Sequence, residues 1–247
     1  NPYIRRYLPD YIRKLDNLPA LEKAMLRHGC WYAKPEASGW FKESWVKIIE
    51  PTQVPLGLKT VRCYDIAATL PDKQVNKNPD YTRGVKACFD KETNTFYVLD
   101  MVSDRNRPAV IQKLIEDTAH QDGKGVYVGL PKDPGAGAIE ALANKVARLA
   151  KLGFRTLVSK TRKSKFERAE GFLIAAQNGN VCLVKGDWNK AFLDEWCGYD
   201  GTDSRNKKDD IVDATADCYN QLMNSMFVPT VTYNKTRAQQ MKGCTLI

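Results

Sequence analysis

The stretch Val61-Arg-Cys-Tyr-Asp65-Ile-Ala67 is a mostly apolar run that carries one acid, and it begins the part of the chain with a strand pattern. Residues 81–89 alternate apolar and polar side chains, and residues 95–102 form a third run rich in β-branched and aromatic residues. The segment 91–94 between the last two runs has the length of a hairpin turn. We therefore predict three sequential antiparallel strands.

Beyond residue 107 the pattern alternates between helices and strands. Apolar residues recur every three or four positions after Pro108, which predicts a helix that ends near residue 122. The same reasoning predicts strands at 126–130, 154–158 and 181–184 and helices at 136–152, 164–178, 188–197 and 208–226. Strands joined through helices run parallel, so we predict an α/β fold with a mixed sheet, three antiparallel strands followed by parallel strands, and helices on both faces.

The remaining segments flank this core. Residues 19–29 predict a short helix closed by Gly29, and Pro51 and Pro55 mark a connector before the first strand. We divide the chain into a linker or N-terminal segment (1–58), a core (59–227) and a C-terminal tail (228–247). The chain opens on Asn1 and not on methionine, so we expect it to be part of a longer polypeptide.

The charge balance indicates a polyanionic partner. The formal net charge is +9 and the isoelectric point is near 9.1, which favours nucleic acid first and an anionic membrane second. No apolar run approaches the length of a membrane span, so we expect a soluble, intracellular protein. The seven cysteines are scattered without a CxxC pair, which argues against a disulfide scaffold and a zinc site.

Two acids have notable positions. Asp65 lies where acids are unusual, and Asp133 lies where acids of active sites are often found. Asp65 sits within an apolar strand, where an unpaired carboxylate costs several kcal/mol, although a strand-end acid can also accept hydrogen bonds from the backbone or from arginine. Asp133 follows a predicted strand and precedes a helix, at the edge where open α/β sheets build their sites. Its Asp-Pro-Gly context is equally typical of a turn.

The last predicted helix carries a third group of acids. Spacings of three and four put Asp210, Asp213 and Asp217 on one face, where like charges repel. The helix dipole accounts for Asp209 and Asp210 at the first turn, but not for the later acids. If these acids meet Asp65 and Asp133, divalent cations would be needed to neutralise them, and hard Mg²⁺ or Mn²⁺ fits oxygen ligands. Two such ions about 4 Å apart would support phosphodiester hydrolysis.

A basic segment between the fifth strand and the next helix is the candidate DNA-binding surface. Such runs are usually solvated surface, but this one lies beside the proposed site and can grip phosphates. Its members are Lys160, Arg162, Lys163, Lys165 and Arg168. Arg105 and Arg107 are further candidates for the same role.

Several phrases over roughly residues 19–226 resemble one family in order and spacing. They include Tyr64-Asp65-Ile-Ala-Ala-Thr, the Asp133-Pro-Gly-Ala-Gly turn and Lys208-Asp-Asp-Ile-Val-Asp213-Ala. The chain resembles the C-terminal nuclease domain of the large terminase subunit of tailed bacteriophages, within the RNase H/RuvC-like superfamily. The resemblance implies an RNase H-like fold and a two-metal endonuclease that cuts double-stranded concatemeric DNA during genome packaging.

The resemblance also assigns roles to residues. Asp65 would bridge two Mg²⁺ or Mn²⁺ ions, Asp133 would be the second acid, and Asp213 with Asp210 would complete the set. Lys208 stands where many relatives have histidine, which leaves the share of Asp209 and Asp210 open. Asp80 and Asp100 also match family phrases, as supporting or structural residues.

The resemblance implies partners and a location as well. An ATPase domain of the same polypeptide would lie upstream; this chain has no phosphate-binding loop, so we expect no ATP hydrolysis from it. A small terminase subunit and a portal ring would be partners besides double-stranded DNA, with no membrane, in the host cytoplasm.

Two other interpretations stay open. The acids are shared by other RNase H-like DNA enzymes, such as junction resolvases and transposase-type recombinases. A non-catalytic DNA-binding module, in which the acids only cap helices, would bind DNA without metal and would not nick it.

Overall fold

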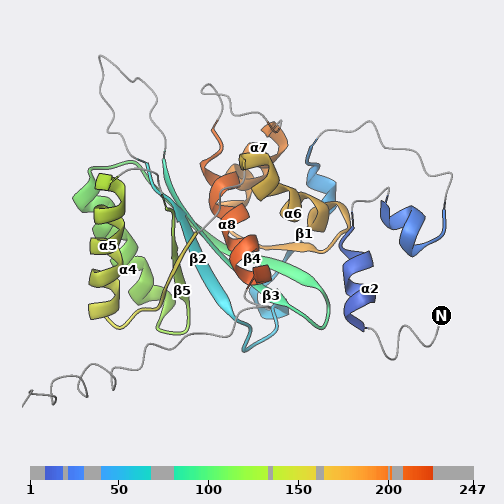
Figure 1. The fold of residues 1–247 in the computed structure, drawn as a ribbon, viewed down its shortest axis with the longest axis horizontal. Coiled ribbons are helices and arrows are strands. Elements are labelled where there is room, and N and C mark those ends of the chain that lie inside the picture. The colour runs from blue at the N-terminus through green and yellow to red at the C-terminus, as the bar shows by residue number, and fades with distance from the viewer. Residues whose placement is uncertain are drawn as a thin grey trace, which may run out of the picture.

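The strands form one mixed sheet in the computed structural model, which describes residues 9–18, 22–30, 40–67, 81–132, 136–159, 164–199, 201 and 208–224. Within these residues the sheet has seven strands in the order β1-β7-β4-β3-β2-β5-β6 (Figure 1). The strands are β1 (Val46–Ile49), β2 (Thr60–Asp65), β3 (Thr82–Asp90), β4 (Thr95–Asp104), β5 (Tyr127–Leu130), β6 (Thr156–Val158) and β7 (Val181–Val184).

The centre of the sheet is the predicted antiparallel unit. β2 pairs with β3, and β3 pairs with β4 through a turn in which Asn94 adopts a positive φ of 55°. Asparagine tolerates this left-handed conformation better than most residues. β5 and β7 then add in parallel to β2 and β4, and β6 pairs in parallel with β5. The predicted mixed sheet is confirmed.

Helices cover both faces of the sheet (Figure 1). α4 (Pro108–Asp122) and α5 (Ala136–Lys151) pack on one face with Tyr64 and Val128. α6 (Lys165–Gln177), α7 (Asn189–Gly198) and α8 (Asp210–Asn224) pack on the other. That second face holds the larger core, in which Phe172 and Trp196 are fully buried with ring centroids 4.4 Å apart. Each such side chain contributes about 1.5–3 kcal/mol by burial.

The alternation of β2 decides which face each of its residues serves. Val61 and Cys63 belong to the core under α6, α7 and α8, whereas Tyr64 belongs to the core under α4 and α5. Successive side chains of a strand point to opposite faces, so Asp65 follows Cys63 to the α8 face. α8 packs on β2 and β3, where the Cys218 thiol donates to the carbonyl oxygen of Val85 at 3.0 Å.

α6 and α8 pack closely because one position lacks a side chain. A Cβ atom on Gly171 would meet Cε1 of Tyr219 at 2.7 Å. The Asn220 amide also donates to the carbonyl oxygen of Arg168 at 3.0 Å. These contacts hold the start of α6 beside the face of α8 that carries the acids.

The N-terminal segment contributes to the sheet, which the sequence did not predict. β1 pairs in parallel with β7, so the sheet reaches upstream of residue 59 into the predicted 1–58 segment, and residues 46–49 are not part of a connector. A four-residue edge strand with only two half-buried side chains has no clear period to recognise.

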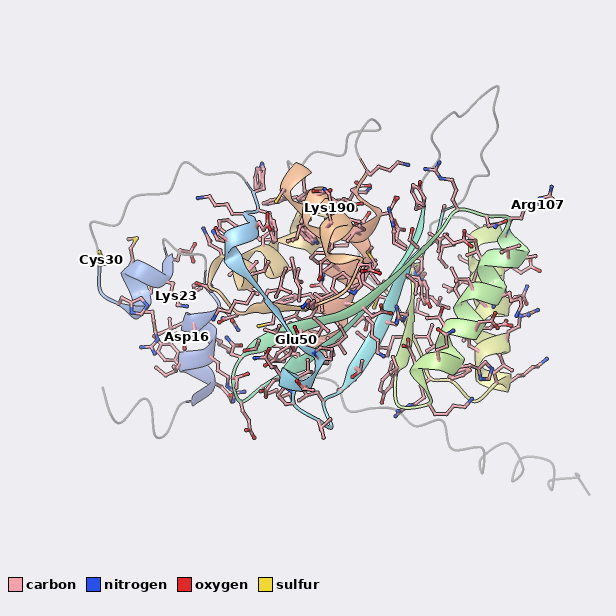
Figure 2. All side chains as sticks on the ribbon, turned by 180° about the vertical axis from the view of Figure 1, so that it is seen from behind. Asp16, Lys23, Cys30, Glu50, Arg107 and Lys190 are labelled. Carbon is pink, nitrogen blue, oxygen red and sulfur yellow. The ribbon has the colours of Figure 1, made fainter. Side chains whose placement is uncertain are left out.

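Two short elements lie further upstream, at the opposite end of the molecule from α4, as Asp16 and Lys23 against Arg107 in Figure 2 illustrate. α2 (Pro9–Asp16) precedes η1 (Lys23–Arg27), a π-helical turn within the predicted helix 19–29 that is followed by Gly29 with φ 71°. The Asn178 amide donates to the carbonyl oxygen of Leu18 at 2.9 Å and ties this region to the end of α6. In the described part of the chain, no helix is long and apolar enough to cross a membrane.

Candidate active site

Asp65 ends β2 on the face covered by α8. Burial raises the pKa of Asp65 well above its usual range, and the charges of Asp213 and Asp210 raise it further. These acids act on each other electrostatically because the strand end and the start of α8 come together. We define the acidic cluster as Asp65, Asp209, which directly precedes α8, and the α8 acids Asp210, Asp213 and Asp217.

The acids of α8 lie on one face, as their spacing predicts, and Asp210, Asp213 and Asp217 are all buried. Asp210 Oδ2 accepts a hydrogen bond from the backbone N–H of Tyr81 at 3.0 Å, which ties the helix to the segment before β3. Buried carboxylates need partners or cations. The neighbours of each acid therefore show how far its charge is compensated.

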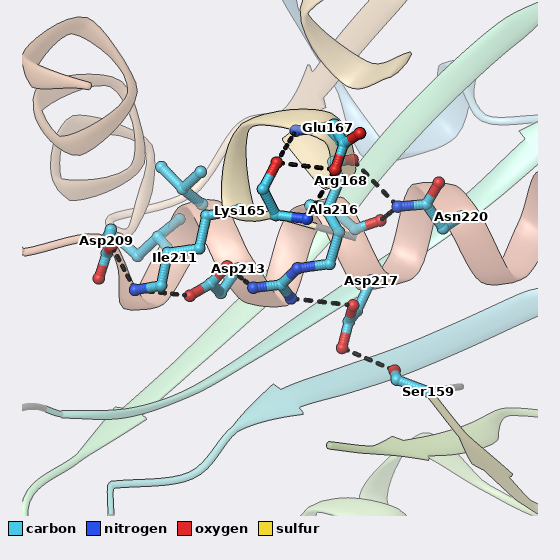
Figure 3. Close-up of polar contacts among 12 residues, drawn as sticks. Ser159, Lys165, Glu167, Arg168, Asp209, Ile211, Asp213, Ala216, Asp217 and Asn220 are labelled. Atoms are coloured by element: carbon cyan, nitrogen blue, oxygen red, sulfur yellow. Dashed lines mark hydrogen bonds and ion pairs between the residues drawn. The ribbon is translucent and has the colours of Figure 1, made fainter. Parts of the chain in front are cut away.

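Two cations of α6 reach into the cluster (Figure 3). Lys165 Nζ lies 2.6 Å from Asp209 Oδ2 and 3.3 Å from Asp213 Oδ2. Arg168 Nη2 lies 2.6 Å from Asp213 Oδ1, and its Nη1 lies 3.5 Å from Asp217 Oδ1. Ser164 begins α6 with a capping box, in which its side chain accepts from the Glu167 N–H, so the helix presents both cations from its first turns.

These cations do not balance the acids. Burial raises the pKa of Asp213 even though Arg168 and Lys165 lower it. Burial likewise raises the pKa of Asp217 against a hydrogen bond from Ser159. A carboxylate with enough cationic partners has a lowered pKa. Burial thus disfavours the ionised forms of Asp213 and Asp217 despite these cations, and a further cation would stabilise them.

Glu195 of α7 is a site-shaping residue that the sequence did not reveal. Its Oε1 accepts from the backbone N–H of Ile211 and, at 3.2 Å, from that of Val212, so it caps the N-terminus of α8 from a neighbouring helix. Burial raises the pKa of Glu195 to about 7. No local pattern marks such a cap, because donor and acceptor belong to different helices.

Ser159 is the second residue that sequence reasoning missed. It follows β6, and its hydroxyl donates to Asp217 Oδ2 at 2.7 Å (Figure 3). Asp217 is one of the two acids that the helix dipole does not explain, and it has a hydroxyl and a guanidinium as partners. It therefore links α8 to both β6 and α6.

The predicted site residues fall into three groups. Asp65, Asp209, Asp210 and Asp213 come together in the acidic cluster, together with the basic residues Lys165 and Arg168, which contact its carboxylates. Asp100 lies elsewhere, in an ion pair with Arg62 at 2.6 Å. Outside the described residues lie Asp80, Asp133, Lys160, Arg162 and Lys163.

The donor chemistry of the cluster suits a divalent cation. Its groups are carboxylate oxygens, the ligands preferred by Mg²⁺ and Mn²⁺, and Asp210, Asp213 and Asp217 are buried. Among the described residues, however, no set of three or more potential ligands is already arranged around one point. Asp133, the second predicted acid, lies outside the described residues.

Comparison with known proteins gives a consistent picture. The nuclease domain of the P22 large terminase superposes with a TM-score of 0.53 at 16% identity, covering 76% of this chain and 93% of that one. The magnesium-bound large terminase nuclease of the thermophilic phage G20c superposes with a TM-score of 0.50 at 15% identity, covering 76% and 99%. At such identities the likeness concerns the fold, which is RNase H-like as predicted. Among curated protein sequences, none matches the chain.

The family itself is established at the level of sequence. The family model of the terminase RNase H-like domain matches residues 62–222, from Arg62 in β2 to Leu222 near the end of α8. This match spans the strands and helices that build the acidic cluster and more than half of the chain. The chain therefore belongs to the terminase RNase H-like domain family.

Proposed function

We propose that this chain is a metal-dependent endonuclease that hydrolyses phosphodiester bonds of double-stranded, concatemeric viral DNA during genome packaging. The observation that carries the proposal is the acidic cluster, in which Asp65, Asp213 and Asp217 have raised pKa values, on a protein of net charge +9. Burying such a set costs stability, so a functional role would explain why the chain carries it. Membership in a terminase domain family supports DNA packaging as that purpose.

The proposed cofactors are two Mg²⁺ or Mn²⁺ ions held by Asp65, Asp133, Asp210 and Asp213, with Asp209 as a further ligand. Bound divalent ions activate water and stabilise the leaving oxygen of a phosphodiester. The G20c nuclease, which has this fold, was solved with bound magnesium. That relative supports the choice of metal, and the count of two rests on the chemistry.

The other residues of the site hold the carboxylates in position. Lys165 and Arg168 draw Asp209, Asp213 and Asp217 together and offset part of their repulsion. Glu195 fixes the start of α8, and Ser159 orients Asp217. Within this proposal Lys160, Arg162 and Lys163 grip DNA phosphates, and Lys165 and Arg168 extend that basic surface to the carboxylates.

Family membership also suggests the wider assembly. We propose that the chain works with an ATPase domain of the same polypeptide, a small terminase subunit and a portal ring, in the host cytoplasm. We further propose residues 59–227 as the nuclease core, with β1 added to its sheet, between the segments 1–58 and 228–247.

The test is cleavage of supercoiled plasmid and of linear duplex DNA with Mn²⁺ or Mg²⁺. We expect cleavage that EDTA abolishes and that Asp65→Asn removes, while circular dichroism and DNA binding stay those of the wild type. Asp194→Asn is the matched control, because Asp194 is an exposed acid of α7 paired only with Lys190 among the described residues, at 2.6 Å.

The outcomes separate the competing functions. A preference for four-way junctions over linear duplexes would point to a resolvase. DNA binding that ignores metal, without nicking, would point to a non-catalytic module. Full cleavage by Asp65→Asn would refute the assignment of the acidic cluster.

A further inference from the structure

Three cations from different parts of the chain gather on the ring of Tyr81. The guanidinium carbon of Arg105 lies 3.9 Å from the ring centroid, that of Arg83 lies 4.5 Å away, and Lys208 Nζ lies 5.3 Å away. All four residues are half-buried. We call this set, Tyr81, Arg83, Arg105 and Lys208, the tyrosine-centred basic patch.

The sheet register explains how the patch assembles. Thr82 pairs with Asp104, so Tyr81 and Arg105, the next residues outward, lie side by side where β3 begins and β4 ends. Arg83 lies two positions from Tyr81 and therefore on the same face. Lys208 arrives from another element, just before α8.

The same contacts place the patch beside the acidic cluster. Arg83 is the cross-strand partner of Asp65, and opposite residues of an antiparallel pair share a face. The Tyr81 N–H donates to Asp210 Oδ2 at 3.0 Å. The charge of Arg83 also lowers the pKa of Glu195, the cap of α8. The patch and the cluster therefore adjoin where β2 ends and β3 begins.

Stacking on the ring of Tyr81 holds the three cations together at one place. A π face attracts a cation through its quadrupole. The three ring contacts thus bring like charges side by side next to the acidic cluster. An arrangement of this kind suits a ligand that brings several negative groups at a regular spacing.

We propose that the tyrosine-centred basic patch binds backbone phosphates of the DNA strand that passes the acidic cluster. This inference rests on the proposed function and deepens it, because it places Arg105, already a candidate from the sequence, in a second basic surface besides the segment 160–168. Arg83, Arg105 and Lys208 contact phosphates, and Tyr81 is a positioning residue that keeps them in place. Such contacts align the strand without reading its sequence.

The chain contains a matched control at the opposite end of the sheet. Arg155 and Lys59 stack on Tyr127 at 4.1 and 4.8 Å, a second tyrosine with two cations. Tyr127 begins β5, which runs parallel to β2, so this group lies at the ends of the strands away from Asp65. A substitution there removes the same kind of charge far from the acids.

The experiment measures binding of a short fluorescein-labelled duplex by fluorescence anisotropy in EDTA, over a range of salt concentrations. Each phosphate contact contributes about 0.9 to the slope of log K against log salt. We expect R83Q/R105Q to weaken binding by at least about tenfold and to lower the slope by about two, and K208Q to lower it by about one. R155Q should behave like the wild type.

Melting curves and circular dichroism verify that each variant folds, and K208Q, which precedes α8, keeps the test valid should the double variant be unstable. Slopes of R83Q/R105Q or K208Q equal to the wild type would overturn the proposal, as would an equal loss in R155Q. A wild-type chain that neither binds nor cuts DNA would instead refute the proposed function, so the two failures are distinguishable.

Discussion

Two residues of β2, Arg62 and Asp65, belong to two charge networks whose carboxylates have opposite pKa shifts. On the α4 side, Arg62 Nη2 lies 2.6 Å from Asp100 and its Nε 2.5 Å from Asp122, while Lys86 Nζ lies 2.9 Å from Asp122. Burial opposes ionisation of Asp122, yet the hydrogen bond and charge of Arg62 lower its pKa. On the α8 side, burial raises the pKa values of Asp213 and Asp217 although the cations Lys165 and Arg168 lower them.

The difference is one of balance. The arginine network, which comprises Arg62, Lys86, Asp100 and Asp122, pairs as many cations as acids, so it stabilises the ionised forms. In the acidic cluster, burial raises the pKa values of Asp65, Asp213 and Asp217 more than the neighbouring cations lower them, so these carboxylates favour proton or metal uptake. Burial by itself therefore does not distinguish the two networks, whereas the direction of the pKa shift does.

The largest effect on stability should come from breaking the balanced network. Arg62→Gln leaves Asp122 buried beside Lys86 alone, and removing one partner of a buried pair costs about 3–5 kcal/mol. Urea unfolding followed by circular dichroism measures the loss. Lys113→Gln breaks an exposed pair with Asp117 in the same helix and should cost less than about 1 kcal/mol. Equal losses in both variants would contradict a structural role for the network.

Asp65→Asn should have the opposite signature. Because the pKa of Asp65 is raised in the folded chain, its charge destabilises the metal-free fold at neutral pH, and the variant should unfold at equal or higher temperature in EDTA. It should also lose Mn²⁺ binding, as measured by isothermal titration calorimetry. A clear drop in melting temperature without change in Mn²⁺ binding would make Asp65 a structural acid.

The balanced network should also show a distinct pH response. The pKa of Asp122 is lowered in the folded chain, so its ionisation contributes stability above its unfolded pKa of about 3.9, and this contribution disappears as pH falls through the folded value. The wild type should therefore exceed Asp122→Asn in stability at pH 7, and the two should converge in acid. Urea titrations at several pH values measure this, and a constant difference would disprove the linkage.

The smallest expected effect is that of Lys165→Gln. Lys165 is one-third exposed, so its ion pairs contribute only about 1 kcal/mol. Its removal frees Asp209 and Asp213 oxygens, and Mn²⁺ affinity should rise because lysine and metal compete for them. Calorimetric titration with Mn²⁺ tests this, with Lys190→Gln as control on the exposed side of α7. Weaker Mn²⁺ binding would mean that the positioning of the ligands by Lys165 outweighs its competition with the metal.

By itself, the sequence determined the elements whose pattern is local. The three central strands, the crossover helices and the strand at 181–184 agree with the structure within a few residues, because period and turn residues act over neighbouring positions. The spacing of Asp210, Asp213 and Asp217 likewise predicted that they share one helix face. The resemblance to the family predicted that Asp65 lies beside them.

Only the tertiary structure determined which distant residues contact one another. β1 is too short to show a period, the Glu195 cap joins two helices, and the pairs of Arg168 with Asp213 and of Ser159 with Asp217 span more than forty positions. Contacts of this kind depend on how elements pack and not on any one element. The balance of charge around each carboxylate, which separates a structural acid from a candidate metal ligand, is therefore a property of the folded chain.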